Sequence, residues 1–150
     1  MKTLSIEQME TLKKLGVDTS KASFVFCKAV WFGDVKQYDV LLENGAFPSE
    51  QKHDRFGYGL HNVVAPDQEP VFTLSDILEL LPDTIEVEKN NYYYLILQKE
   101  TNAYYHCIYE NLDLAILHRY RSNTMIEAAY NMLLWVIEKG YLNNNKIGDK

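Results

Sequence analysis

A polar stretch near the middle of the chain holds the residue types that come closest to an acid–base or metal site. His53 and His61 bracket Asp54 there, among several Gly and Pro residues. Imidazole nitrogens and a carboxylate can transfer protons or ligate a metal ion when a fold brings them together. The same residue types are also common in solvated loops. A small hydrolase-like enzyme built on this loop is therefore the third of three functional hypotheses.

Other signatures of enzymatic chemistry are absent from the sequence. It has no phosphate-binding loop, no Cys-x-x-Cys and no His-Glu-x-x-His motif. Gly57-Tyr58-Gly59 is an isolated Gly-x-Gly, which is typical of a turn. His106 and Cys107 are neighbours in a predicted strand, so they point to opposite faces and cannot pair as base and nucleophile. We therefore predict no catalytic residue, no metal site and no cofactor.

Tyrosine is the residue type in excess. The chain has 11 tyrosines in 150 residues, and seven of them lie within 92–120. Strand alternation sends these tyrosines to both faces of the predicted sheet. If helices cover one face, Tyr92 and Tyr94, with Tyr104 or Tyr105, are left on the other. Such tyrosines can be cross-strand pairs that stabilise the sheet, or a recognition face that offers contact area and a hydrogen-bonding hydroxyl.

A local basic patch, His118-Arg119-Tyr120-Arg121, adjoins these tyrosines. Aromatic side chains combined with cations can bind single-stranded nucleic acid. The formal net charge of −6 and the scattered distribution of 15 Lys and Arg residues make a nucleic-acid partner unlikely. We therefore expect protein binding or self-association, with nucleic-acid binding as the alternative. The expected partner-binding residues are Tyr92, Tyr94, Tyr104, Tyr105, Arg119 and Arg121.

Three segments carry the signals of helices. Each begins with a Ser or Thr that is followed three residues later by Gln, Asp or Glu, which is the spacing of a capping box. Apolar residues then recur at helical spacing, and a Gly or Pro follows as a stop. The capping pairs are Ser5/Gln8, Thr73/Asp76 and Thr124/Glu127, and the stops are Gly16, Pro82 and Gly140. These signals predict helices at about 5–15, 74–81 and 125–139.

Runs of β-branched and aromatic residues predict the strands. They lie at 22–32, 36–43, 84–88, 92–99 and 103–110, with a further one within 115–120. Gly33-Asp34 and Glu100-Thr101-Asn102 are the turns of two hairpins. Strands and helices do not alternate, so the sequence predicts an α+β fold. In it, the three helices pack mainly on one face of an antiparallel sheet built from hairpins.

The length of 150 residues predicts a single domain over 1–150 that needs neither disulfide nor metal to fold. Cys27 and Cys107 are expected to be buried thiols. Residues 46–71 are predicted to be a long loop or to hold short strands, for instance at 55–58 or 60–64. Residues 143–150 are predicted to be a frayed tail. Without a signal peptide or a long apolar run, we expect a cytoplasmic protein with no membrane partner.

Two resemblances to known families can be identified. Residues 33–61 resemble one ankyrin repeat, but no second copy follows and about three are needed to bury their faces, so we interpret this match as coincidental. The second resemblance runs through LSIEQM (4–9), LGVDTS (15–20), FTLSDILELLP (72–82), IEAAYNMLLW (126–135) and EKGY (138–141). These segments are similar to small uncharacterised proteins of gut anaerobic bacteria, their prophages and mobile elements. The resemblance implies a cytoplasmic accessory protein and transfers no catalytic residue.

Overall fold

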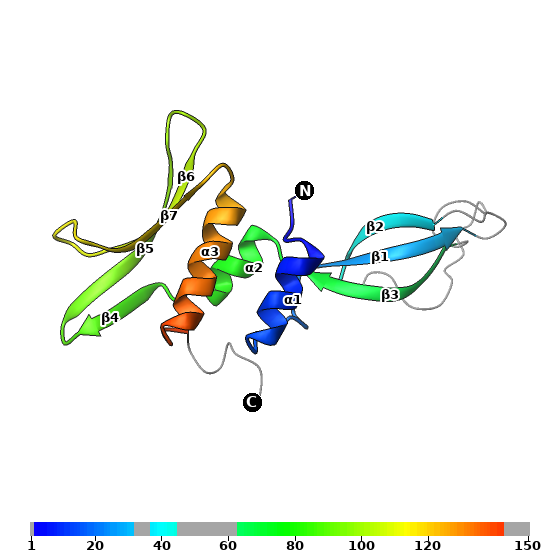
Figure 1. Ribbon diagram of the computed structural model, residues 1–150, viewed down its shortest axis with the longest axis horizontal. Helices are drawn as coiled ribbons and strands as arrows, with labels where there is room; N and C mark the ends of the chain where they lie inside the picture. The colour runs from blue at the N-terminus through cyan, green and yellow to red at the C-terminus, as the bar shows by residue number, and fades with distance from the viewer. Residues whose placement is uncertain (1, 32–36, 45–62, 143–150) are drawn as a thin grey trace.

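The computed structural model describes residues 2–31, 37–44 and 63–142. Figure 1 shows the helices in the middle of the molecule, with one sheet on each side. The elements follow the order α1 (Ile6–Lys14), β1 (Phe24–Trp31), β2 (Gln37–Glu43), β3 (Val63–Val71), α2 (Leu74–Leu80), β4 (Thr84–Glu88), β5 (Asn91–Lys99), β6 (Tyr105–Glu110), β7 (Ile116–Ser122) and α3 (Met125–Glu138). The α+β fold predicted from the sequence is confirmed.

The strands form two antiparallel sheets, whereas the sequence predicted one. The three-stranded sheet has the order β2-β1-β3, and the four-stranded sheet has the order β4-β5-β6-β7. The short helix α2 stands between β3 and β4 in the chain and separates the two sheets. Which hairpins join into one sheet depends on such connections, and the alternation within each strand carries no information about them.

Part of the region that was expected to be a long loop or to hold short strands is one strand, β3. β3 extends over nine residues and pairs with β1 through most of its length. It contains Pro66 and Pro70, which cannot donate ladder hydrogen bonds. Proline is tolerated there because β3 lies at the edge of the sheet that the described residues form, with β1 as its neighbour. Residues 45–62, which include the first suggested short strand, the predicted His53-Asp54-His61 group and most of the ankyrin-like match, lie outside the described residues.

The N-terminal caps of the helices also connect them to other elements. In α1, Ser5 and Gln8 form the predicted capping box, and in α2 Thr73 and Asp76 form another. At α3 only one half of the predicted box is present, because Thr124 accepts from the Glu127 amide. The Glu127 carboxylate instead accepts from Gln8 Nε2 at 3.2 Å. The cap of α1 is therefore bonded to the first turn of α3.

The core lies between the helices and one face of the four-stranded sheet. α3 contributes eight buried residues, among them Met132, Leu133 and Val136. β6 contributes Cys107 and Tyr109, and both side chains are fully buried. Burial raises the pKa of the Cys107 thiol to about 12, so this group stays a neutral, unpaired thiol at physiological pH. The side chain of Cys27 is outside the described residues.

Candidate functional site

α3 covers one face of the four-stranded sheet and leaves the other face bare. α3 packs on β6 and β7, and in Figure 1 all three helices lie on the same side of this sheet. Among the described elements none packs on the opposite side. We call that side the uncovered face. By strand register it carries Thr84 and Glu86 of β4, Tyr92, Tyr94, Ile96 and Gln98 of β5, His106, Ile108 and Glu110 of β6, and Arg119 and Arg121 of β7.

The structure brings five of the six predicted binding residues to the uncovered face. Tyr92 and Tyr94 lie there with 41% and 38% of their surface exposed. Tyr104 precedes β6, and the Arg121 guanidinium lies 3.6 Å from the centroid of its ring. Tyr105 shares its face with Cys107 and Tyr109 instead, and it lines a small hollow beside Leu74, Met125 and Ile126. The expectation that Tyr105 joins the other tyrosines is therefore corrected.

Tyr92 and Tyr94 lie at one end of the uncovered face, which we call the tyrosine end, and Arg121 lies with Tyr104 at the opposite end, the arginine end. Tyr94 pairs with Glu110 across β5 and β6, whereas Arg121 pairs with His106 near the far end of β6. At the tyrosine end, the Tyr92 hydroxyl bonds to the carboxylate of its cross-strand neighbour Glu86. This hydrogen bond, followed by the charge of Glu86, raises the pKa of Tyr92 above its ordinary value. The tyrosine end is thus acidic as well as aromatic.

The arginine end is held in place by one carboxylate. Glu100 Oε2 accepts hydrogen bonds from His106 Nε2 and from Arg121 Nε, each at 3.0 Å. The bond from His106 and then the bond from Arg121 lower the pKa of Glu100. Arg121 is thereby fixed between this carboxylate and the ring of Tyr104. Arg119, two residues earlier on the same face, makes no ion pair within the described residues.

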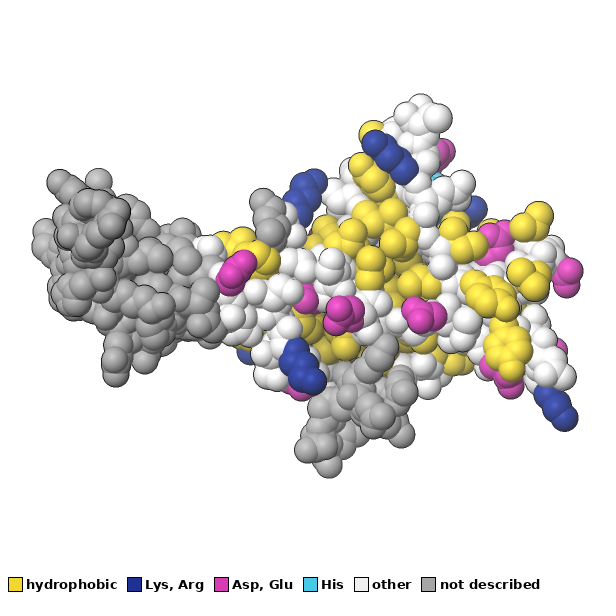
Figure 2. Space-filling model, turned by 180° about the vertical axis from the view of Figure 1, so that it is seen from behind, with side chains coloured by type: hydrophobic (Ala, Val, Ile, Leu, Met, Phe, Trp, Pro, Cys, Tyr) yellow, Lys and Arg dark blue, Asp and Glu magenta, His cyan; other side chains and the backbone are white. Residues whose placement is uncertain are grey.

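Exposed apolar side chains gather at the tyrosine end, and sequence reasoning missed most of them. Of the eight large hydrophobic residues that are exposed in the described chain, six lie near the two turns at this end. They are Val87, Tyr92, Tyr94, Leu112, Leu114 and Ile116. Figure 2 shows hydrophobic side chains, interspersed with acidic ones, over this half of the molecule. The remaining two, Leu15 and Leu97, lie away from both turns.

The turn between β6 and β7 presents two leucines in a fixed geometry. We call residues Asn111–Ala115 the leucine turn; Leu112 and Leu114 in it are 84% and 77% exposed. Asn111 Oδ1 accepts from the amides of Asp113 and Ala115 at 3.0 and 2.9 Å. Asn111 Nδ2 donates to Asn91 Oδ1 at the start of β5, at 3.4 Å. The Asn111 side chain therefore holds the turn in shape and ties it to the neighbouring hairpin.

His106 is the histidine of the uncovered face. His106 is oriented by Glu100, but its other ring nitrogen, Nδ1, is buried without a hydrogen-bond partner among the described residues. The bond to Glu100 therefore fixes the orientation of the imidazole ring. The described residues also contain no group of three or more His, Cys, Asp and Glu that could hold a metal ion.

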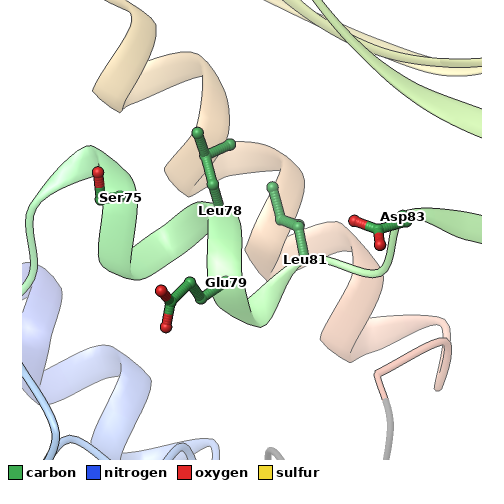
Figure 3. A pocket seen from close by; sticks show the side chains of 5 residues that line it. All are labelled: Ser75, Leu78, Glu79, Leu81 and Asp83. Atoms are coloured by element: carbon green, nitrogen blue, oxygen red, sulfur yellow. The ribbon is translucent and has the colours of Figure 1, made fainter.

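A shallow hollow along α2 offers no alternative site. Figure 3 shows it lined by Ser75, Leu78, Glu79, Leu81 and Asp83, from α2 and the segment that leads to β4. Leu78 and Leu81 are directed toward α3, and Leu81 is fully buried, so they belong to the core. Glu79 is directed away from them. The polar groups do not converge on one point, as a small-molecule site requires.

None of the helices in the described ranges is long and apolar enough to cross a lipid bilayer. Comparison of the chain with models of known protein families, with curated proteins and with solved structures finds no match, so the resemblance noted in the sequence stays a prediction.

Proposed function

We propose that this chain is a non-enzymatic protein-binding domain, which contacts another protein or a second copy of itself through the uncovered face and the leucine turn. One observation carries the proposal. Six of the eight exposed large hydrophobic residues in the described chain gather at one end of one sheet. Scattered exposed apolar residues are ordinary, whereas a contiguous group of them on a soluble protein marks an interaction site.

The distribution of charge favours a protein partner over a nucleic acid. Glu86 and Glu110 flank the exposed tyrosines, so a nucleic acid whose bases stacked there would bring its phosphates close to carboxylates. The ring of Tyr104 is already covered by Arg121, and the charge of Arg121 is partly offset by Glu100. The alternative proposal, single-strand binding through the tyrosines with Arg119 and Arg121, is tested by a salt titration. We expect no affinity at low salt; binding that falls steeply as salt rises would overturn our preference.

We propose further that the chain is a cytoplasmic accessory protein. This proposal is supported by the resemblance to prophage- and mobile-element-associated proteins and by the buried, unpaired thiol of Cys107, which suits a reducing compartment.

The experiment compares two surface variants by cross-linking in the native cells and quantitative mass spectrometry. The first is Tyr92→Ser with Tyr94→Ser, which strips the uncovered face. The matched control is Leu15→Ser, because Leu15 has the same 41% exposure as Tyr92 but ends α1. We expect the face variant to lose the cross-linked partner and the control to keep it. Each lost cross-strand pair should cost only about 0.2–1 kcal/mol of stability.

Two results would count against the proposal. If the face variant captures the same partners as the unmodified chain, the uncovered face is not the binding surface. If circular dichroism shows that Tyr92→Ser with Tyr94→Ser unfolds the domain, the two tyrosines stabilise the fold and the recognition role is wrong.

A further inference from the structure

We propose, on the basis of the function above, that the uncovered face binds a second copy of the chain, face to face about a two-fold axis. The face has carboxylates at its tyrosine end, from Glu86 and Glu110, and guanidinium groups at its other end, from Arg119 and Arg121. A two-fold interface sets the same patch against itself in reversed order. A face that is acidic at one end and basic at the other is therefore complementary to its own copy.

The two charges nearest the proposed axis, those of Glu110 and Arg119, form no ion pair with a described residue of the same copy. Both ion pairs among the described residues use Glu100, so neither Glu110 nor Arg119 takes part in one. Glu110 lies on β6 and Arg119 on β7, and Arg119 stands beside Ile108, two residues before Glu110. The two side chains thus share a face, close to its centre, without forming an ion pair with each other. A partner with one sign of charge would leave one of them opposite a like charge.

The strand register defines where each residue would go. Consider a two-fold axis in the contact plane that passes between Glu110 and Arg119, at right angles to the line that joins them. It places Glu110 of each copy over Arg119 of the other. The same rotation carries Glu86 toward Arg121 of the second copy. It also carries Tyr94 toward the gap between the two arginines, where its ring can stack on a guanidinium.

The centre of the uncovered face suits contact near such an axis. Ile108 is only 5% exposed although no described element packs on that side, so its neighbours within the sheet already shield it. Four strands about 4.8 Å apart and seven residues of about 3.3 Å each give a flat face of roughly 19 by 23 Å. That is about half of the roughly 800 Å² that each partner buries in a standard interface. We therefore expect weak association, which must be measured at high protein concentration.

The test is a charge swap followed by sedimentation equilibrium at low salt, at concentrations up to several hundred micromolar. Glu110→Arg and Arg119→Glu should each weaken self-association at least tenfold, because like charges then meet twice per dimer. An equimolar mixture of the two variants should regain the dimer, since both guanidinium groups of one variant then face both carboxylates of the other. The double variant should regain it as well. The control Glu10→Arg makes the same change in net charge as Glu110→Arg, at an exposed position of α1, and should leave association unchanged.

The outcomes separate this proposal from the proposed function. A chain that stays monomeric at every concentration, but still loses a cross-linked protein when Tyr92 and Tyr94 are replaced, binds a different partner. In that case the second copy is refuted and the protein-binding role stands. A dimer that neither charge reversal weakens, or a mixture that fails to recover, refutes the face-to-face arrangement. A monomer that loses no partner on replacement of the tyrosines refutes both.

Discussion

Tyr109 joins the four-stranded sheet to the end of α2, and its hydroxyl provides a direct test of what this connection contributes to stability. The side chain of Tyr109 is fully buried, and the hydroxyl donates to the Pro82 carbonyl at 2.7 Å. Burial in the core raises the pKa of Tyr109, which favours the protonated hydroxyl that donates this bond. Tyr109→Phe keeps the ring and removes only this bond.

The expected cost follows from what the substitution leaves behind. A hydrogen bond contributes about 0.5–1.5 kcal/mol net, and an acceptor that is left unsatisfied in the interior raises the loss to about 1–3 kcal/mol. Because Pro82 is half-buried, its carbonyl can regain part of this by hydration. We expect the free energy of unfolding to fall by about 1.5 kcal/mol. In a chain of this length that lowers the melting temperature by about 3–6 °C.

Urea denaturation followed by tryptophan fluorescence measures this change. The midpoint should fall with an unchanged slope, since the surface exposed on unfolding is the same. Tyr130→Phe is the matched control, because the Tyr130 ring is also buried but its hydroxyl makes no hydrogen bond to a described residue. It should change the free energy of unfolding by less than about 0.5 kcal/mol. Equal losses in the two variants, or no loss in Tyr109→Phe, would refute the reasoning.

Three further predictions concern the scaffold. Burial, and then the charge of Lys139, lower the pKa of His118. The unfolded chain therefore binds a proton at His118 more readily than the folded chain does. Urea titrations should show that this histidine's effect on the free energy of unfolding is absent above about pH 6.5, and that the free energy of unfolding falls as the pH is lowered further. His118→Gln should weaken this pH dependence. Glu127→Ala should lower the free energy of unfolding by about 1 kcal/mol, because Gln8 loses its acceptor on α3; thermal denaturation should show a lower melting temperature. Gly140→Ala should lower the free energy of unfolding by about 1 kcal/mol, as measured by urea titration. Gly140 has φ +75° and nothing lies within 4 Å of an added Cβ, so the loss comes from backbone strain alone.

The helices could be predicted closely because their signals are local. The expected ranges 5–15, 74–81 and 125–139 exceed the observed helices by one residue at most at each end. The glycine stops act as predicted: Gly16 adopts φ 90°, and the amide of Val17 bonds back to Leu12 as a helix-terminating motif requires. Each of these interactions joins residues that are a few positions apart. A sequence pattern therefore contains both partners.

The division into two sheets and the strand β3 could not be predicted in the same way. Strand pairing joins residues that are far apart, such as Phe24 with Val71. The prolines of β3 argued against a strand, and they are compatible with one only because β3 has a neighbour on one side. That position at the edge is a property of the assembled sheet.

The candidate site shows the same limit at the level of single residues. Tyr92 and Tyr94 could be assigned to one face because their strand begins cleanly after a turn. Tyr104 and Tyr105 could not, because the face on which each lies depends on where β6 begins. The strand was expected from residue 103, but Ala103 adopts φ 64° and the strand begins at Tyr105. The leucine turn had a usable signal, since turns normally carry polar residues, Gly or Pro rather than two leucines.

The exposed leucines set the scale of binding that the proposed surface can support. Leu112 and Leu114 are the most exposed of the large apolar residues in the described chain, because the turn that carries them extends beyond the strands that could shield them. Covering one leucine completely is worth about 1.5–3 kcal/mol. The face alone is about half the size of a standard interface, so a partner that covers only the face binds weakly. A partner that also encloses both leucines gains up to about 3–6 kcal/mol, a factor of more than a hundred in affinity. Leu112→Ser with Leu114→Ser, which leaves the face intact, therefore distinguishes these two modes of binding.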